Sequence, residues 1–173
     1  MLFADIVGFT ELAATMPAHV LVELLNDLFT RFDLAAQKLG IEKIKTIGDA
    51  YMAVCGLPEP CADHTERMVT MALRLLEIAR EFSENRGTTV RLRIGINRGP
   101  VVAGVVGRNK FIYDLWGDAV NLASRMESHG LPDTIQVTRS VIENLQGRYP
   151  FEPRGTVEVK GKDAIETWTL TCN

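Results

Sequence analysis

Two long amphipathic segments, separated by a hairpin-like pattern, constrain the fold of this chain more than any other feature. The first segment ends before Gly40, and a glycine commonly follows the last residue of a helix. Its apolar face consists of Leu21, Leu25, Leu28, Phe32, Ala36 and Leu39. The face of the second consists of Met68, Ala72, Leu75, Ala79 and Phe82. Each segment predicts a helix that buries one side against a common layer.

Strand-length segments flank these two helices. Residues 1–7 read as a strand, 42–47 and 50–55 as a hairpin that turns at Gly48 and Asp49, and 90–97 as a further strand. The resulting order is βαββαβ. We therefore predict an α+β fold with a ferredoxin-like core and a mainly antiparallel sheet. Both helices should cover one face, leaving the other face for a partner or a substrate.

The remainder predicts an α/β extension of the same domain. Its expected elements are strands at Val101–Val106 and Phe111–Leu115, a helix at about Asp118–Ser128, a strand near Thr134–Val137, a short helix capped by Thr138, and a closing hairpin of Gly155–Lys160 and Thr167–Thr171 around Gly161. We expect one domain over residues 1–173. Because the first strand has no polar lead-in, we also expect a fragment of a longer protein whose upstream part is absent.

The composition of the chain limits the classes of partner that we expect it to bind. A net charge of −3 gives no general affinity for nucleic-acid backbones or anionic membranes, so we expect neither partner. The apolar stretches are too short to cross a bilayer, and no signal peptide precedes them.

The three cysteines, Cys55, Cys61 and Cys172, cannot all pair within one chain. Reduced thiols and a cytoplasmic location are the expectation.

Two aspartates lie where predicted strands end. Asp5 is in an apolar strand, and Asp49 is at the tip of the hairpin that should neighbour it. Taken singly, Asp49 could be only a turn residue and Asp5 only a strand-end charge. Together they could hold a pair of hard cations, with the backbone oxygen of Ile6 as an extra ligand. An unpaired buried carboxylate is costly, and a metal ion satisfies it.

Residues 111–127 carry the most informative pattern. Asn121 and Arg125 are four apart on a predicted helix and so project from one face. Arg125 could be an ordinary surface cation, paired with Glu127 or a nearby acid. An amide beside a guanidinium can also stabilise charge that develops on a ribose oxygen and on phosphate. The nearby glycines match no phosphate-binding loop, and the histidines show no zinc-ligand spacing.

Three segments, residues 3–10, 42–52 and 113–127, resemble the signature segments of class III adenylyl cyclases. The resemblance covers nearly the whole chain, and it is nearest to bacterial cyclases that are similar to mammalian membrane enzymes. It implies a phosphorus–oxygen lyase of intracellular signalling. That enzyme converts ATP to 3′,5′-cyclic AMP and pyrophosphate by attack of the ribose 3′-oxygen on the α-phosphorus.

The resemblance also implies roles for single residues. Asp5 and Asp49 match aspartates that hold two Mg²⁺ or Mn²⁺ ions, while Asn121 and Arg125 match the pair that stabilises the transition state. Lys160 matches a lysine that binds the terminal phosphates, although Lys162 is close enough to leave the choice open.

Lys45 and Asp114 match the pair that reads adenine. Adenine offers an amine donor and a ring-nitrogen acceptor, which a carboxylate and an ammonium satisfy. Guanylyl cyclases of the family typically have Glu and Cys at these two places, so the resemblance favours ATP.

The resemblance implies a homodimer with two-fold symmetric sites at its interface. The aspartates would come from one protomer and the other site residues from its partner, so a monomer should be inactive. Two alternatives stay open: a guanylyl cyclase, and a catalytically silent nucleotide-binding or dimerisation module. The parent protein could carry a membrane or regulatory domain upstream.

Overall fold

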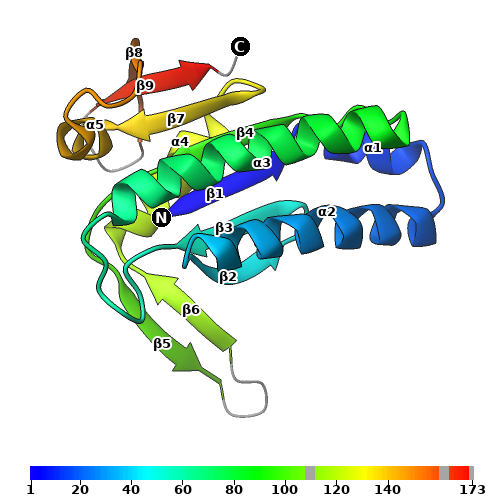
Figure 1. Cartoon of the computed structure of the whole chain (residues 1–173), viewed down its shortest axis with the longest axis horizontal. Helices are drawn as coiled ribbons and strands as arrows, with labels where there is room; N and C mark the ends of the chain where they lie inside the picture. Colours follow the sequence, from blue (N-terminus) through cyan, green and yellow to red (C-terminus); the bar gives the residue numbers. More distant parts are fainter. Residues whose placement is uncertain (108–111, 160–163, 172–173) are drawn as a thin grey trace.

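The computed structural model describes residues 1–107, 112–159 and 164–171 of the chain. In this part, seven strands form one sheet in the order β2-β3-β1-β4-β7-β9-β8, and β5 and β6 form a separate ribbon (Figure 1). The strands are β1 (Leu2–Ile6), β2 (Glu42–Ile47), β3 (Ala50–Val54), β4 (Leu92–Ile96), β5 (Val102–Val106), β6 (Ile112–Trp116), β7 (Thr134–Thr138), β8 (Glu152–Val157) and β9 (Ile165–Thr171). The helices are α1 (Phe9–Ala14), α2 (Ala18–Lys38), α3 (His64–Arg86), α4 (Asp118–Ser128) and α5 (Arg139–Leu145).

The predicted α+β fold is confirmed. β1 lies between β3 and β4 and pairs antiparallel with both, as a βαββαβ core requires. β4 and β7 pair in parallel, and the other paired strands of the described sheet are antiparallel. One local difference is α1, a short helix that begins at Phe9 where the sequence indicated only a turn.

One face of the sheet packs against α2 and α3. Side chains alternate along β1, so Leu2, Ala4 and Ile6 enter the core beneath these helices while Phe3 and Asp5 point to the opposite face. All five predicted apolar positions of α3 are buried. In α2 the buried residues are Leu24, Leu28, Phe32, Ala35 and Ala36, so the buried face of this helix is rotated slightly from the predicted one.

The expectation that the second face is open is wrong in part, because α4 packs on it against β4, β1 and β7. Gly95 in β4 allows this approach. A Cβ at that position would lie 2.6 Å from the carbonyl oxygen of Ala123 and closer still to the amide nitrogen of Glu127. The missing side chain therefore lets the helix backbone rest directly on the strand.

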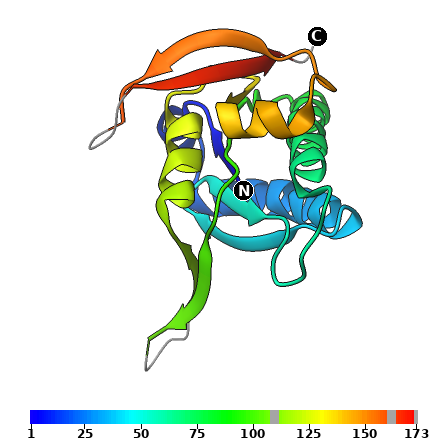
Figure 2. The ribbon, with the colours of Figure 1, turned by 90° about the vertical axis from the view of Figure 1, so that its left-hand side faces the viewer.

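The ribbon of β5 and β6 extends away from the body of the molecule (Figures 1 and 2). Large apolar side chains are exposed along it: Val102, Val105, Val106, Tyr113 and Trp116. An exposed apolar group of this extent is typical of a surface that another molecule covers.

Thr138 is the N-cap residue of α5, as expected, but its hydroxyl does not cap the helix. It donates instead to Oδ1 of Asn97 at 2.7 Å, and Asn97 Nδ2 donates to the carbonyl oxygen of Ala119 at 3.0 Å. This buried network ties the start of α4 to β7. Among the described residues, no helix is both long and apolar enough to cross a membrane.

Candidate active site

Asp5 on β1 and Asp49 in the β2–β3 turn face each other. Gly48, with φ of +62°, makes the tight turn that places Asp49 there. Burial, then a hydrogen bond with Asp5 and the negative charge of Asp5, raise the pKa of Asp49 to about 6. A turn residue that merely faced water would not have a raised pKa. The two predicted metal ligands therefore lie next to each other in the fold.

Arg93 and Glu127 extend this site, and neither was predicted as part of it. Nη2 of Arg93 on β4 donates to Oδ2 of Asp5 at 2.7 Å, and its Nε lies 3.3 Å from Oε1 of Glu127 on α4. Burial and the charge of Asp5 raise the pKa of Glu127 to about 7, although Arg93 acts in the opposite direction. Arg93 interrupts an apolar strand just as Asp5 does, so the same argument applied to β4 would have found it.

Lys45 on β2 and Asp114 on β6 form a half-buried ion pair, with Nζ and Oδ2 2.5 Å apart. Burial acts to raise the pKa of Asp114, but hydrogen bonds from Lys45 and the Leu115 amide, with the charge of Lys45, bring it below its ordinary value. The carboxyl group is therefore an ionised acceptor beside an ammonium donor. This pair joins the ribbon to the edge of the main sheet.

Asn121 and Arg125 lie on the exposed side of α4. The buried residues of this helix are Ala119, Ala123, Met126 and Glu127. At about 100° per residue, the mean direction of Asn121 and Arg125 is roughly 180° from that of the buried set. Glu127 pairs with Arg93, and within the described part of the chain Arg125 makes no ion pair. The expected pairing of Arg125 with Glu127 is therefore wrong, whereas the exposure of Arg125 leaves open the alternative that it is an ordinary surface cation.

Residues 1–172 match the family described as the adenylate and guanylate cyclase catalytic domain. The chain belongs to this family. An adenylate cyclase of Mycobacterium bovis is 48% identical over 170 residues, which are 98% of this chain and 38% of that protein. Guanylate cyclase 2G of Rattus norvegicus is 46% identical over 177 residues, covering 98% of this chain and 16% of that protein.

Solved structures agree with the family assignment. The guanylate cyclase domain of RhGC from Catenaria anguillulae, in complex with GTP, has a TM-score of 0.93 at 38% identity, covering 98% of this chain and 93% of that one. The adenylyl cyclase CyaB from P. aeruginosa has a TM-score of 0.93 at 25% identity, covering 99% and 92%. Relatives of both nucleotide specificities are thus similar to this cyclase domain. The domain spans well under half the length of the curated relatives cited above.

The chemistry of the aspartate pair fits the metal dependence that is general in class III cyclase domains. Oxygen ligands suit Mg²⁺ and Mn²⁺, and Mg²⁺ is commonly held by one or two carboxylates plus substrate phosphates. Among the described residues, no cluster of three or more His, Cys, Asp or Glu side chains could hold a metal ion. The carbonyl of Ile6 stays a predicted ligand.

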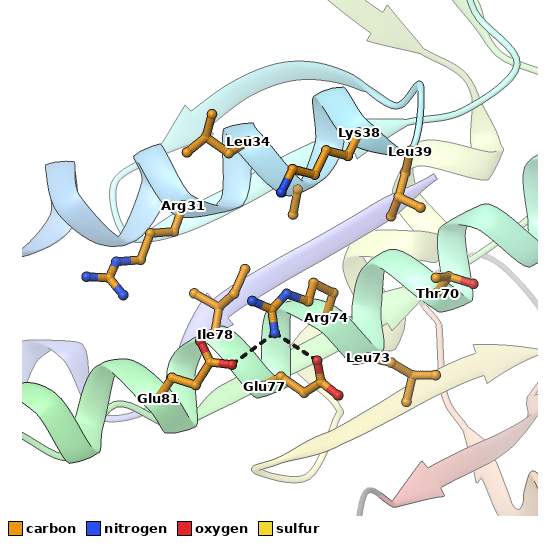
Figure 3. A pocket seen from close by; sticks show the side chains of 11 residues that line it. Arg31, Leu34, Lys38, Leu39, Thr70, Leu73, Arg74, Glu77, Ile78 and Glu81 are labelled. Carbon is orange, nitrogen blue, oxygen red and sulfur yellow. Dashed lines mark hydrogen bonds and ion pairs between the residues drawn. The ribbon is translucent and has the colours of Figure 1, made fainter.

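One groove of the cyclase domain lies apart from this site. A groove of about 560 Å³ lies between α2 and α3, and none of its lining residues is a predicted site residue. Figure 3 shows that Arg74 in this groove is paired with Glu77 and Glu81, at 2.9 and 3.0 Å.

Lys160 and Lys162, the candidate phosphate ligands, lie outside the described residues.

Proposed function

We propose that this cyclase domain converts ATP to 3′,5′-cyclic AMP and pyrophosphate. The observation that carries the choice of ATP is the pairing of Lys45 with Asp114. An ionised carboxylate accepts from the exocyclic amine of adenine, and an adjacent ammonium donates to a ring nitrogen. Guanine presents an acceptor in place of that amine, so Asp114 would be left facing an oxygen.

The other site residues act by position and charge. When bound, two divalent cations at Asp5 and Asp49 would lower the pKa of the ribose 3′-hydroxyl and neutralise phosphate charge. Arg125 offers a planar set of donors for the charge that develops at the α-phosphorus, and Asn121 orients the ribose. Lys160, or alternatively Lys162, binds the terminal phosphates. No side chain is assigned as a general base.

The proposal includes a homodimer with composite sites. Asn121 and Arg125 point away from the sheet, whereas Asp5 lies on the sheet surface that α4 covers. One copy of the chain therefore directs its metal ligands and its transition-state pair in different directions. Two copies related by a two-fold axis would complete two equivalent sites. The exposed apolar ribbon supplies a surface for such an interface.

The proposal also places one domain, residues 1–173, in the cytoplasm, within a longer protein that could carry a membrane or regulatory domain. The catalytically silent module is disfavoured because Asp5, Asp49, Asn121 and Arg125 are all present. A guanylyl cyclase is disfavoured by the Lys45 and Asp114 pair.

The test is product formation from ATP and from GTP, measured side by side with Mn²⁺ over a range of protein concentrations. Cyclic AMP from ATP is expected, with specific activity that rises with protein concentration because dilution separates the dimer. The Arg125→Ala variant controls for contaminating cyclases. Faster formation of cyclic GMP would identify a guanylyl cyclase. A folded, dimeric sample that makes neither product would identify the silent module.

A further inference from the structure

Two cysteines lie together at the connection between β3 and α3, outside the proposed active site. Cys55 follows β3 directly and is buried, while Cys61 precedes α3 and is partly exposed. Both thiols are free, and Cys61 packs against the core cluster that contains Cys55. The mechanism above uses neither of them.

The surroundings of the two sulfur atoms give them different chemistry. Burial, then the charge of Cys61 and a hydrogen bond with it, raise the pKa of the Cys55 thiol to about 11. The Cys61 thiol donates to Oδ1 of Asp63 at 2.7 Å, and Nε of Arg67 donates to Oδ2 of the same carboxylate at 2.9 Å. Cys61 is thus the accessible thiol, hydrogen-bonded to a carboxylate, and Cys55 is the protected thiol beside it.

A cavity beside the two cysteines gives small molecules a path to Cys61. It has a volume of about 300 Å³, and its lining includes Cys55, Cys61, His64 and Arg98. Arg98 is exposed and gives the cavity a positive charge. A small anionic oxidant, such as a disulfide that carries carboxylates, suits this opening.

We propose that Cys55 and Cys61 are a redox-active dithiol that low-molecular-weight disulfides oxidise reversibly to an intramolecular disulfide. The Cys61 thiolate attacks one sulfur of the oxidant RSSR, forming a mixed disulfide and releasing RS⁻. The Cys55 thiolate then attacks Sγ of Cys61, forming the protein disulfide and releasing the second RS⁻. The two protein thiols lose two protons and two electrons, and RSSR becomes two RSH. A reducing cytoplasm reverses the exchange.

This oxidation has a route to the proposed active site. Leu57, between the two cysteines, packs against a cluster that contains Leu115 and Ala123. Leu115 adjoins Asp114, and Ala123 lies on α4 between Asn121 and Arg125. A bond between Cys55 and Cys61 would draw together the two ends of the β3–α3 connection, which contains Leu57. We therefore expect Leu57 to move and, through the apolar cluster, to displace Asp114 and α4. This consequence for activity rests on the proposed function.

The thiols can be tested without any nucleotide, in a Cys172→Ser background that removes the third cysteine. Treatment with oxidised glutathione should abolish both titratable thiols and lower the intact mass by two hydrogen atoms. A peptide map should show Cys55 joined to Cys61, and dithiothreitol should restore both thiols. The added Cys55→Ser change should stop the reaction at a glutathione adduct on Cys61, whereas Cys61→Ser should leave Cys55 free in the folded chain.

A stable glutathione adduct on Cys61 with Cys55 still free would overturn the proposal, and so would disulfide-linked dimers. Cyclase activity of the oxidised sample should fall about tenfold or more and recover on reduction, because small displacements of catalytic groups cost rate. Unchanged activity in a fully oxidised sample would overturn the regulatory role. If the chain has no cyclase activity, the thiol and mass results still decide whether the dithiol exists.

Discussion

Lys45 and Asp114 are 69 positions apart in the chain, and the fold brings their charged atoms to 2.5 Å. Replacing them together by Lys45→Glu and Asp114→Cys should lower kcat/KM for ATP about 100-fold or more, because adenine would lose both of its polar partners. Rates with ATP and GTP measure the change. Lys43→Met is a matched control, since Lys43 lies on the same strand but pairs with Asp33. Unaltered ATP turnover in the double variant would remove the base-reading role.

Asp49 carries a second prediction at the residue scale. Its pKa is raised to about 6, so the folded chain binds this proton more tightly than the unfolded chain does. Without metal, the Asp49 contribution to stability is therefore fully present below about pH 4 and is lost as the pH rises through about 6. Mn²⁺ should reverse this loss, because it binds the ionised pair.

Thermal unfolding with and without Mn²⁺ measures this effect. At pH 7.5 and a hundredfold excess over Kd, Mn²⁺ should add about 2.7 kcal/mol of stability. This raises the Tm by several degrees, and little change is expected at pH 4.5. Asp49→Asn should abolish the response, whereas Asp27→Asn, which alters an ion-paired carboxylate on α2, should retain it. An equal response in the Asp49 variant would contradict the metal site.

At the scale of elements, the seating of α4 on β4 depends on Gly95. Gly95→Ala would force a methyl group into the backbone of α4, and over-packing of this kind costs about 1–3 kcal/mol or more. We expect a lower midpoint in urea unfolding and a loss of cyclase activity, because α4 carries Asn121 and Arg125. Gly104→Ala is the control, since its new methyl would meet only the side chain of Trp116 at 3.3 Å. An unchanged midpoint for Gly95→Ala would show that α4 is not held there.

Most elements could be predicted because apolar periodicity and turn glycines determine them locally. The hairpin at Gly48 and the helix Asp118–Ser128 are two such cases. The docking of α4 could not be predicted, because Gly95 has no side chain and contributes nothing to a periodic pattern. Arg93 interrupts an apolar strand and could have been found from the sequence. Glu127 could not, because its contact with Arg93 joins a strand to a helix that is distant in the sequence.

At the scale of the whole molecule, the proposed site needs a second copy of the chain. Within one copy of the chain, the fold brings Asp5 next to Asp49 and Lys45 next to Asp114. Asn121 and Arg125 lie on the side of α4 opposite its buried residues, so what they meet depends on assembly. Sequence patterns indicate which residues share a helix face, but not which protomer's substrate that face contacts.

Mixing two inactive variants tests the central claim most directly. Asp5→Ala removes one half of each composite site and Arg125→Ala removes the other, so each homodimer should be nearly inactive. An equal mixture should recover about a quarter of wild-type activity, since half of the dimers are mixed and each has one intact site. If both variants fold and dimerise but their mixture stays inactive, the active site is not shared between two copies and the proposed composite site is wrong.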